Sequence, residues 1–257
     1  MEFISPAAFA KRSVLSVQEY SLLSARSISN VFQRPRYVAD TMQQADLIGV
    51  GSLPIVALTG LFTGVVLALN YSPTLERFGS LSLTGQLVSL TMVRELGPVL
   101  TSLMVAGRNA SGMASEIGSM KVTEQIDAMR ALGTDPTKKL VTPRVFATVF
   151  MLFFLTILSD LVGLFGGFLY SFAVLGLDAY QYWNTAYQIL TYNDVLTGLV
   201  KPIFFGFIIS TVGCYYGIST TGGTQGVGRA TTQAVVTASV LILVVDVVLA
   251  QLLLSLR

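Results

Sequence analysis

Five charged side chains stand inside stretches of the sequence that are otherwise apolar. They are an arginine, a lysine and three carboxylates: Arg94, Glu95, Asp160, Lys201 and Asp246. A charge placed in hydrocarbon costs on the order of 3 kcal/mol, so such groups should face protein or water and should find partners. Either a cation pairs with a carboxylate as a brace between helices, or the charges line a cavity for an amphiphile. Both arrangements can hold at once.

In the cavity interpretation, Arg94 and Lys201 lie near an anionic headgroup, with Glu95 and Asp246 in the same cluster. Apolar side chains would then lie beside the acyl tails, and we expect these to be Leu67, Leu75, Phe78 and Leu96. Pro98 follows Arg94 by four residues and has no backbone N–H to donate. It predicts a kink that leaves room for a cavity close to the charges.

Few residues are available for enzyme chemistry. The chain has no histidine, and its one cysteine, Cys214, stands in an apolar stretch. We therefore predict no catalytic residue and no metal site. Residues 223–230 have the spacing of a phosphate loop, but Arg229 replaces the required lysine and Ala230 the required hydroxyl residue. We expect a flexible turn there, and no cofactor bound by this chain. A net charge of +2 without a basic run argues against nucleic acid.

The stretch SEIGSMKVTEQIDAMRALGTDP, residues 115–136, combines apolar and charged side chains. Its pattern predicts an amphipathic helix over about 116–132. Gly133 can take the left-handed closing position, while Asp135 and Pro136 can cap and start the next helix. A solvated loop helix with an Asp127–Arg130 ion pair is the plain alternative. A well-bounded helix between two membrane spans is, however, well placed to meet a cytoplasmic partner.

The elements that must position these residues are predicted to be membrane-spanning helices. Of the 257 residues, 53% are hydrophobic and 12% are charged, about half the charge of an ordinary soluble domain. Five apolar runs exceed the length of about 20 residues that crosses a bilayer. They cover residues 47–71, 83–106, 145–175, 195–218 and 231–256. We expect an all-α membrane protein whose five-helix transmembrane domain covers residues 45–257.

The lysines and arginines indicate how the chain is oriented. They concentrate before the first span, between the second and third, and between the fourth and fifth, whereas the other side holds only Arg77 and Arg257. The positive-inside rule then puts the N-terminus in the cytoplasm and the C-terminus on the far side. Gly60 and Gly64 form a small-xxx-small pair, which predicts close helix packing either within one subunit or in a dimer.

Residues 1–44 are predicted to form an interfacial segment. Apolar side chains recur at helical spacing, interrupted by one serine: Val14, Val17, Tyr20, Ser24, Ile28 and Val31. We expect an amphipathic helix on the cytoplasmic membrane surface, ended near Pro35, with a solvated tail as the alternative. A second interfacial segment, rich in aromatic residues, is expected on the outer side at residues 177–194.

Two motifs carry a resemblance to a known family. The run RELGPVLTSLMVAGRNASGMASEIGSMKVTEQIDAMRALGTDPTKKLVTPR, residues 94–144, and the later GVGRATTQAVV resemble the permease subunits of the MlaE (YrbE) family. These subunits belong to lipid ABC transporters of the Mla/MCE system. The ELGP and EIGxMKVTEQIDA motifs are specific, and the resemblance covers essentially the whole chain from the N-terminal segment onward.

The resemblance implies a homodimeric permease that moves phospholipids or related lipids between membranes. Its implied partners are cytoplasmic ABC ATPase subunits, which use ATP and Mg, and an MCE-domain lipid-binding protein on the outer face. Together with the lack of a transit peptide it favours a bacterial inner membrane. The charged helix becomes the coupling helix, with candidate ATPase contacts at Glu116, Lys121, Thr123, Glu124, Gln125 and Asp127. Arg94, Glu95, Lys201 and Asp246 match charges of the family, whereas Asp160 does not.

Another class of transporter also fits the charged residues. An ion-coupled secondary lipid carrier could use Glu95, Asp160 or Asp246 as a proton relay. Five spans without an internal repeat do not divide into the paired halves of many secondary carriers, which counts against it. A membrane enzyme or scaffold has still less support, because the sequence offers little catalytic chemistry.

Overall fold

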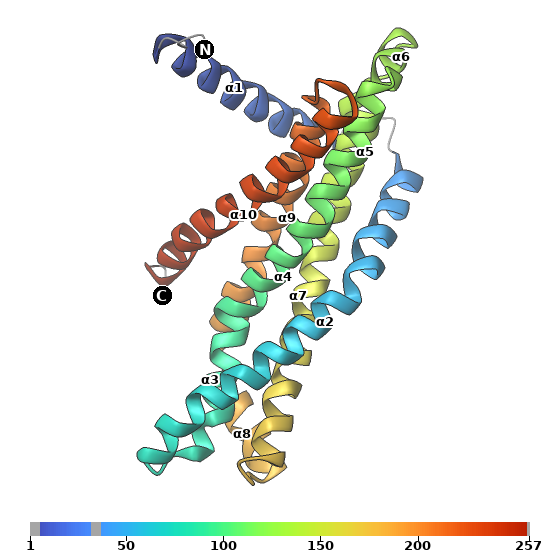
Figure 1. Ribbon diagram of the computed structural model, residues 1–257. Coiled ribbons are helices and arrows are strands. Elements are labelled where there is room, and N and C mark those ends of the chain that lie inside the picture. Colours follow the sequence, from blue (N-terminus) through green and yellow to red (C-terminus); the bar gives the residue numbers. More distant parts are fainter. Residues whose placement is uncertain (1–5, 32–36, 256–257) are drawn as a thin grey trace.

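The computed structural model describes residues 6–31 and 37–255, and within these ranges the regular structure is entirely helical. The elements are α1 (Pro6–Val31), α2 (Val38–Arg77), η1 (Leu81–Leu83), α3 (Thr84–Thr91), η2 (Met92–Leu96), α4 (Gly97–Val105), η3 (Ala106–Ala110), α5 (Ser111–Val122), α6 (Gln125–Ala131), η4 (Thr137–Val141), α7 (Thr142–Ala173), α8 (Ala179–Gln188), α9 (Tyr192–Ile218) and α10 (Gly223–Ser255). They form an elongated bundle with α1, α5 and α6 at one end and α3 and α8 at the other (Figure 1). The expected all-α fold class is confirmed.

Five segments of the described residues are long and apolar enough to cross a membrane. They are Val38–Arg77, Leu81–Val122, Thr137–Ala173, Tyr192–Ile218 and Gly223–Leu253. The second of these runs continuously through α3, η2, α4, η3 and α5. α2 begins at Val38, ahead of the start expected at residue 45, while the helix end expected near Pro35 lies outside the described residues.

The N-terminal helix α1 projects away from the bundle (Figure 1). The Tyr20 hydroxyl lies 2.9 Å from Thr211 Oγ1, and the Tyr20 ring packs edge-on against Tyr215 with 5.8 Å between centroids. Val14, Val17 and Ile28 are left exposed. One side of α1 therefore docks on α9, while its exposed apolar residues suit a membrane surface.

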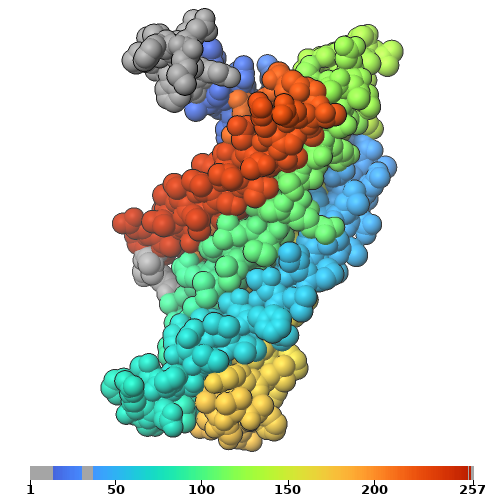
Figure 2. Space-filling view, viewed as in Figure 1, coloured from blue at the N-terminus to red at the C-terminus, as the bar shows by residue number. Residues whose placement is uncertain are grey.

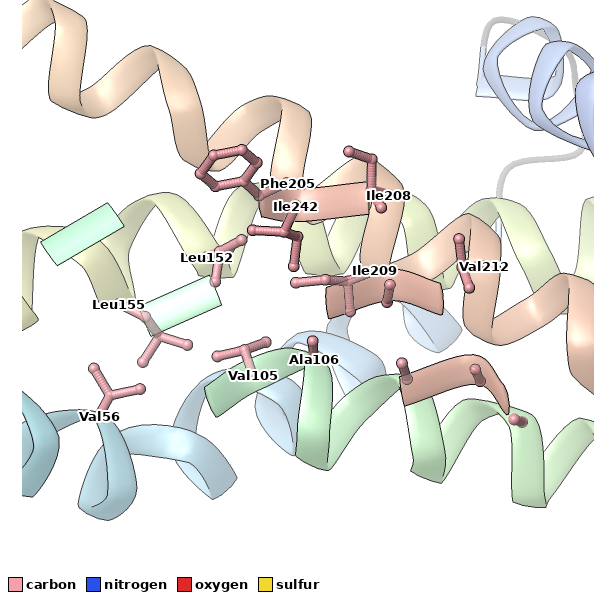
Figure 3. Close-up of a cluster of buried hydrophobic side chains, with 14 residues drawn as sticks. Val56, Val105, Ala106, Leu152, Leu155, Phe205, Ile208, Ile209, Val212 and Ile242 are labelled. Atoms are coloured by element: carbon pink, nitrogen blue, oxygen red, sulfur yellow. The ribbon is translucent and has the colours of Figure 1, made fainter. Parts of the chain in front are cut away.

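The core joins helices that are far apart in the sequence. Figure 3 shows Val56 of α2, Val105 of α4, Leu152 of α7, Phe205 of α9 and Ile242 of α10 converging in one cluster. Each of these side chains is 2% exposed or less. Because lipid is as apolar as these side chains, close van der Waals packing holds such helices together.

Glycines allow α2 and α7 to approach closely. A Cβ built on Gly60 would lie 2.8 Å from the carbonyl oxygen of Ser159, and one built on Gly64 would overlap the carbonyl group of Gly163. Both glycines are buried within the subunit. The small-xxx-small pair therefore packs α2 against α7 within one subunit. It is not exposed for a dimer interface, which was the other possibility.

Gly64→Ala is expected to lower the stability of the folded protein by about 1–3 kcal/mol, because the added methyl group must push α2 away from α7. Thermal unfolding of the purified protein in detergent measures this loss. Gly112→Ala is the matched control, since a Cβ at Gly112 meets no atom within 4 Å. The control should be neutral or slightly more stable, because alanine favours a helix. Equal stability of the two variants would contradict the packing argument.

The charged stretch after the second span differs from its prediction. The single helix expected over about 116–132 is divided, because α5 ends at Val122 and α6 begins at Gln125. Glu124 lies between them with φ 62°, a left-handed conformation that ends a right-handed helix. The apolar pattern of the sequence continues through this break, so the pattern did not predict the break. The predicted end is confirmed: Gly133 has φ 79° and Asp135 Oδ1 accepts from the Thr137 N–H at 2.9 Å.

Residues 223–230 also differ from the expected flexible turn, because α10 already begins at Gly223. The turn is confined to the residues between the end of α9 and that glycine. Figure 2 shows α10 lying across the outside of α4 and α5. Only 11% of its apolar stretch is buried. This helix therefore leaves a large apolar surface for lipid or another chain.

Candidate functional site

Lys201 of α9 is completely buried and lies between two carboxylates. Its ammonium contacts Glu95 Oε2 of η2 and lies 2.9 Å from Asp246 Oδ1 of α10. The side chains of Glu95 and Asp246 are 44% and 18% exposed. A buried ammonium requires such compensation. The structure thus contains the brace considered from the sequence, and it joins three helices.

The backbone around Pro98 brings Glu95 to this cluster. Pro98 cannot donate to the preceding turn, and the helix widens just before it into the π-turn η2, in which the Gly97 N–H bonds to the Met92 carbonyl. On the facing helix, a Cβ at Gly198 would overlap the carbonyl oxygen of Val93. The absence of that side chain lets η2 and α9 approach closely enough for Glu95 to reach Lys201.

Arg94 makes a separate ion pair with Asp194, a residue that the sequence analysis missed. Arg94 Nε donates to Asp194 Oδ1 at 2.6 Å, and Nη2 lies 2.5 Å from the same oxygen. Asp194 Oδ2 accepts from the N–H and the hydroxyl of Thr191, at 3.0 and 2.7 Å, in a capping box that begins α9. The Thr-x-x-Asp spacing at 191–194 was the signal that could have found it.

Asp160 of α7 does not join the charge cluster. Its side chain is buried and packs against Gly97, where a Cβ would overlap Asp160 Oδ1. Within residues 6–31 and 37–255, this oxygen has no hydrogen-bond partner. A buried polar atom of this kind is uncommon and calls for an explanation, such as a functional role.

A cavity of about 270 Å³ opens beside Arg94 and Glu95. Its other walls come from α3, α9 and α10: Leu90, Thr91, Thr197, Ala250 and Leu253. The apolar residues expected beside the tails lie elsewhere. Leu67 and Leu96 pack against a buried cluster around Met92, Leu75 is buried in α2, and Phe78 is 77% exposed at the end of α2. None of these four residues lines this cavity, which α10 rather than α2 closes.

Several candidate coupling residues form ion pairs with other residues of the same chain. Glu116 Oε2 lies 2.8 Å from Nη2 of Arg144, which is 4% exposed and also donates to the Leu140 carbonyl. Lys121 Nζ bonds to Asp127 Oδ2 at 2.8 Å. This hydrogen bond lowers the pKa of Asp127 below its ordinary value, so the carboxylate is ionised at neutral pH. Glu116 therefore braces α5 to α7, while Lys121 and Asp127 fasten α5 to α6.

The remaining candidates surround the break between α5 and α6. Gln125 Nε2 donates to Thr123 Oγ1 at 3.0 Å, and that hydroxyl donates to the Ser119 carbonyl at 2.8 Å. The Glu124 side chain is exposed and has no hydrogen bond or ion pair with any other described residue. Glu124 is thus the carboxylate that this turn presents outward.

Glu116→Gln is expected to destabilise the protein by about 1–2 kcal/mol, because it leaves the buried Arg144 guanidinium without its carboxylate. The loss should be smaller than for a fully buried pair, since Glu116 is half exposed. Thermal unfolding in detergent measures it. Lys121→Gln breaks an exposed ion pair and should leave stability unchanged within error. A neutral Glu116→Gln would show that Arg144 does not depend on this partner.

Comparisons with known proteins identify relatives of this chain. The permease family MlaE matches residues 41–252. A probable ABC transporter permease protein of Rickettsia typhi is 44% identical over 238 residues, which cover 93% of this chain and 92% of the relative. The intermembrane phospholipid transport system permease protein MlaE of Haemophilus influenzae is 36% identical over 209 residues, covering 81% and 80%.

A plant protein is also similar to this chain. The chloroplastic protein TRIGALACTOSYLDIACYLGLYCEROL 1 of Arabidopsis thaliana is 37% identical over 228 residues, which cover 89% of this chain and 65% of the relative. The resemblance seen in the ELGP and EIGxMKVTEQIDA motifs is thereby confirmed over most of the sequence. With five apolar segments of spanning length among its described residues and this relation to known permeases, the chain belongs to the MlaE permease family.

Proposed function

We propose that this chain is the membrane-spanning permease of an ABC transporter that moves phospholipids or related lipids between the inner and outer membranes of a bacterium. The observation that carries the proposal is the buried Lys201 ammonium held between Glu95 and Asp246, next to a cavity that Arg94 also lines. Charges and apolar side chains on one cavity suit an amphiphile. The Haemophilus influenzae relative is named as a permease of intermembrane phospholipid transport, which supports the same substrate class.

A separate cytoplasmic ATPase would supply the energy, binding ATP and Mg itself, while this chain binds no cofactor and does no chemistry on the lipid. Thr123, Glu124 and Gln125 form the part of the α5–α6 turn offered to that partner. The helical segment Leu81–Val122 runs from this turn to Glu95, about 40 Å along a helix at 1.5 Å per residue. A displacement of the turn would therefore reach the charged cluster, and η3, a second π-turn in this segment, is a place where the helix could adjust.

The proposed assembly is a homodimer in the bacterial inner membrane. The exposed apolar face of α10 offers surface for a second copy, which would enlarge the cavity beside Arg94 and Glu95. The α6 end, with its lysines and arginines, would face the cytoplasm together with the N-terminus, and the C-terminus would face the periplasm. An MCE-domain protein would meet the opposite end, where α8 lies.

Lipid extraction from the purified transporter tests the substrate class. We expect mass spectrometry to find phospholipid bound to the wild-type protein, and a smaller amount per protein after Arg94→Gln combined with Glu95→Gln, because the cavity loses both charges. The matched control is Arg77→Gln, an arginine at the end of α2 that does not line the cavity. A wild-type protein free of phospholipid, or equal lipid in all three, would contradict the proposal.

The ion-coupled carrier remains as a second candidate because Asp160 is buried without a hydrogen-bond partner among the described residues. Transport in liposomes separates the two. The ABC proposal expects transport to require the ATPase and ATP, and to survive collapse of the proton gradient. Transport without an ATPase that is abolished by an uncoupler and by Asp160→Asn would favour the carrier.

A further inference from the structure

A second cavity, of about 510 Å³, lies between α1, α6 and α9, at the end of the bundle that carries the charged turn. α1 contributes Glu19 and Arg26 to its walls, and α6 contributes Arg130. Hydroxyl groups complete the polar part of the lining, from Thr137, Tyr215 and Ser219. Neither the ion cluster nor the proposed transport path includes these residues.

The charge on this cavity is not balanced. Among the described residues, no carboxylate lies within 4.0 Å of the Arg26 guanidinium, which is exposed on α1. Arg130 lies 3.1 Å from Asp127 through one nitrogen and is 56% exposed, so its other donors remain accessible. Each guanidinium has five N–H donors in a fork that matches a phosphate. Two arginines against Glu19 favour an anion with several acceptor oxygens.

The same cavity has an apolar side, formed by Leu22, Leu23, Ile126 and Ile218. The spanning helix α9 ends at Ile218, and α1 leaves Val17 and Ile28 exposed as a helix on a membrane surface does. The opening therefore lies where a bilayer changes from acyl chains to headgroups. A free phosphate would use only the polar walls, whereas a lipid would use both.

We propose that this cavity binds the phosphodiester of an anionic phospholipid from the leaflet at the α6 end, as a resident lipid rather than as transported cargo. Arg26 and Arg130 hold the phosphate, and the apolar walls cover the first part of the acyl chains. Basic pockets at this depth of membrane proteins bind such headgroups. Because Arg130 is in the last turn of α6, the bound lipid ties the interfacial helix α1 to the charged turn. This site goes beyond the proposed function.

Native mass spectrometry of the full-length protein in detergent tests the site, with equal amounts of phosphatidylglycerol and phosphatidylcholine added. We expect the wild-type protein to retain phosphatidylglycerol preferentially, and Arg26→Gln combined with Arg130→Gln to reduce that retention at least about tenfold. Arg229→Gln, an exposed arginine at the same end but outside the lining, should retain it fully. Glu19→Gln removes the opposing charge and should increase retention.

Further variants and conditions separate this site from its alternatives. Lys201→Met combined with Glu95→Gln and Asp246→Asn, which leaves no unpaired charge in the ion cluster, should keep the preference for phosphatidylglycerol, because the ion cluster lies outside this cavity. Four outcomes would overturn the proposal: equal retention of both lipids, full retention by the double arginine variant, loss of the preference in the folded triple variant, or displacement of phosphatidylglycerol by millimolar inorganic phosphate. A double variant that retains the lipid but no longer captures an ATPase would assign the cavity to a protein partner, and would overturn it as well.

Discussion

Lys201→Met is expected to destabilise the protein by about 3–5 kcal/mol and to abolish transport, because it leaves two carboxylates in the membrane without their cation. Lys201 is fully buried, and its ammonium is shared by Glu95 and Asp246 from two other helices. Methionine has a similar length and no charge, so the lost interaction is electrostatic rather than steric. Thermal unfolding in detergent measures the stability, and ATP-driven lipid transfer between liposomes measures the transport.

A neutral version of the cluster separates its structural role from its role in transport. Lys201→Met combined with Glu95→Gln and Asp246→Asn leaves no unpaired charge, and replacement of a whole buried ion pair is often close to neutral. We expect this triple variant to regain stability to within about 1 kcal/mol of wild type, yet to stay inactive because the ion cluster beside the cavity has lost its charges. Transport at the wild-type rate by the triple variant would show that the cluster is a brace alone. An unaltered melting temperature for Lys201→Met would contradict the ion pairs.

Glu124→Lys is expected to weaken capture of the cytoplasmic ATPase at least about tenfold while the protein stays folded. Reversal of a charge at an interface costs binding free energy, whereas an exposed side chain without a partner contributes little to stability. Glu124 meets both conditions, since it is exposed and is displayed by a left-handed backbone between α5 and α6. Pull-down of the ATPase from detergent measures capture, and the yield of monodisperse protein reports folding.

Two other substitutions distinguish the carboxylate from the backbone shape. Glu124→Asn tolerates the left-handed conformation without carrying a charge, and Glu124→Gly removes a strain of about 1–2 kcal/mol. We expect both to melt at or above the wild-type temperature and both to capture the ATPase more weakly than wild type, though less weakly than Glu124→Lys does. Normal capture by Glu124→Lys would remove the main support for this turn as the coupling contact. Normal capture by Glu124→Gly would assign its role to the backbone shape.

The ion cluster was predictable from the sequence only in part. Lys201 and the carboxylates stand out because a charge among apolar residues is costly and must be compensated, which holds in any arrangement of the spans. Which partner each charge meets depends on helix rotation and depth. Arg94 could have met any of three acids, but the π-turn before Pro98 and the capping box that Thr191 and Asp194 form at the start of α9 give it Asp194.

In the charged stretch at residues 115–136, some features likewise follow from the local sequence and others depend on tertiary packing. Gly133, Asp135 and Pro136 determine where it ends, because these residues act through local backbone preferences. The break at Glu124 has no such local signal: a non-glycine residue adopts a left-handed conformation only where its surroundings hold it there. The internal pairing of Glu116 with Arg144 was equally hidden, since the two side chains come from helices that only tertiary packing brings together.

Local chemistry in the chain was sufficient to determine the five membrane spans, the helical class, the need to compensate the buried charges and the family. These follow from the length of apolar runs and from short motifs, which do not depend on distant contacts. The tertiary structure alone decided which helices exchange charges, that α10 rather than α2 closes the cavity beside Glu95, and that α1, α6 and α9 enclose a second one. Apolar helices in lipid have little preference for one neighbour over another until close packing, small residues and ion pairs select it.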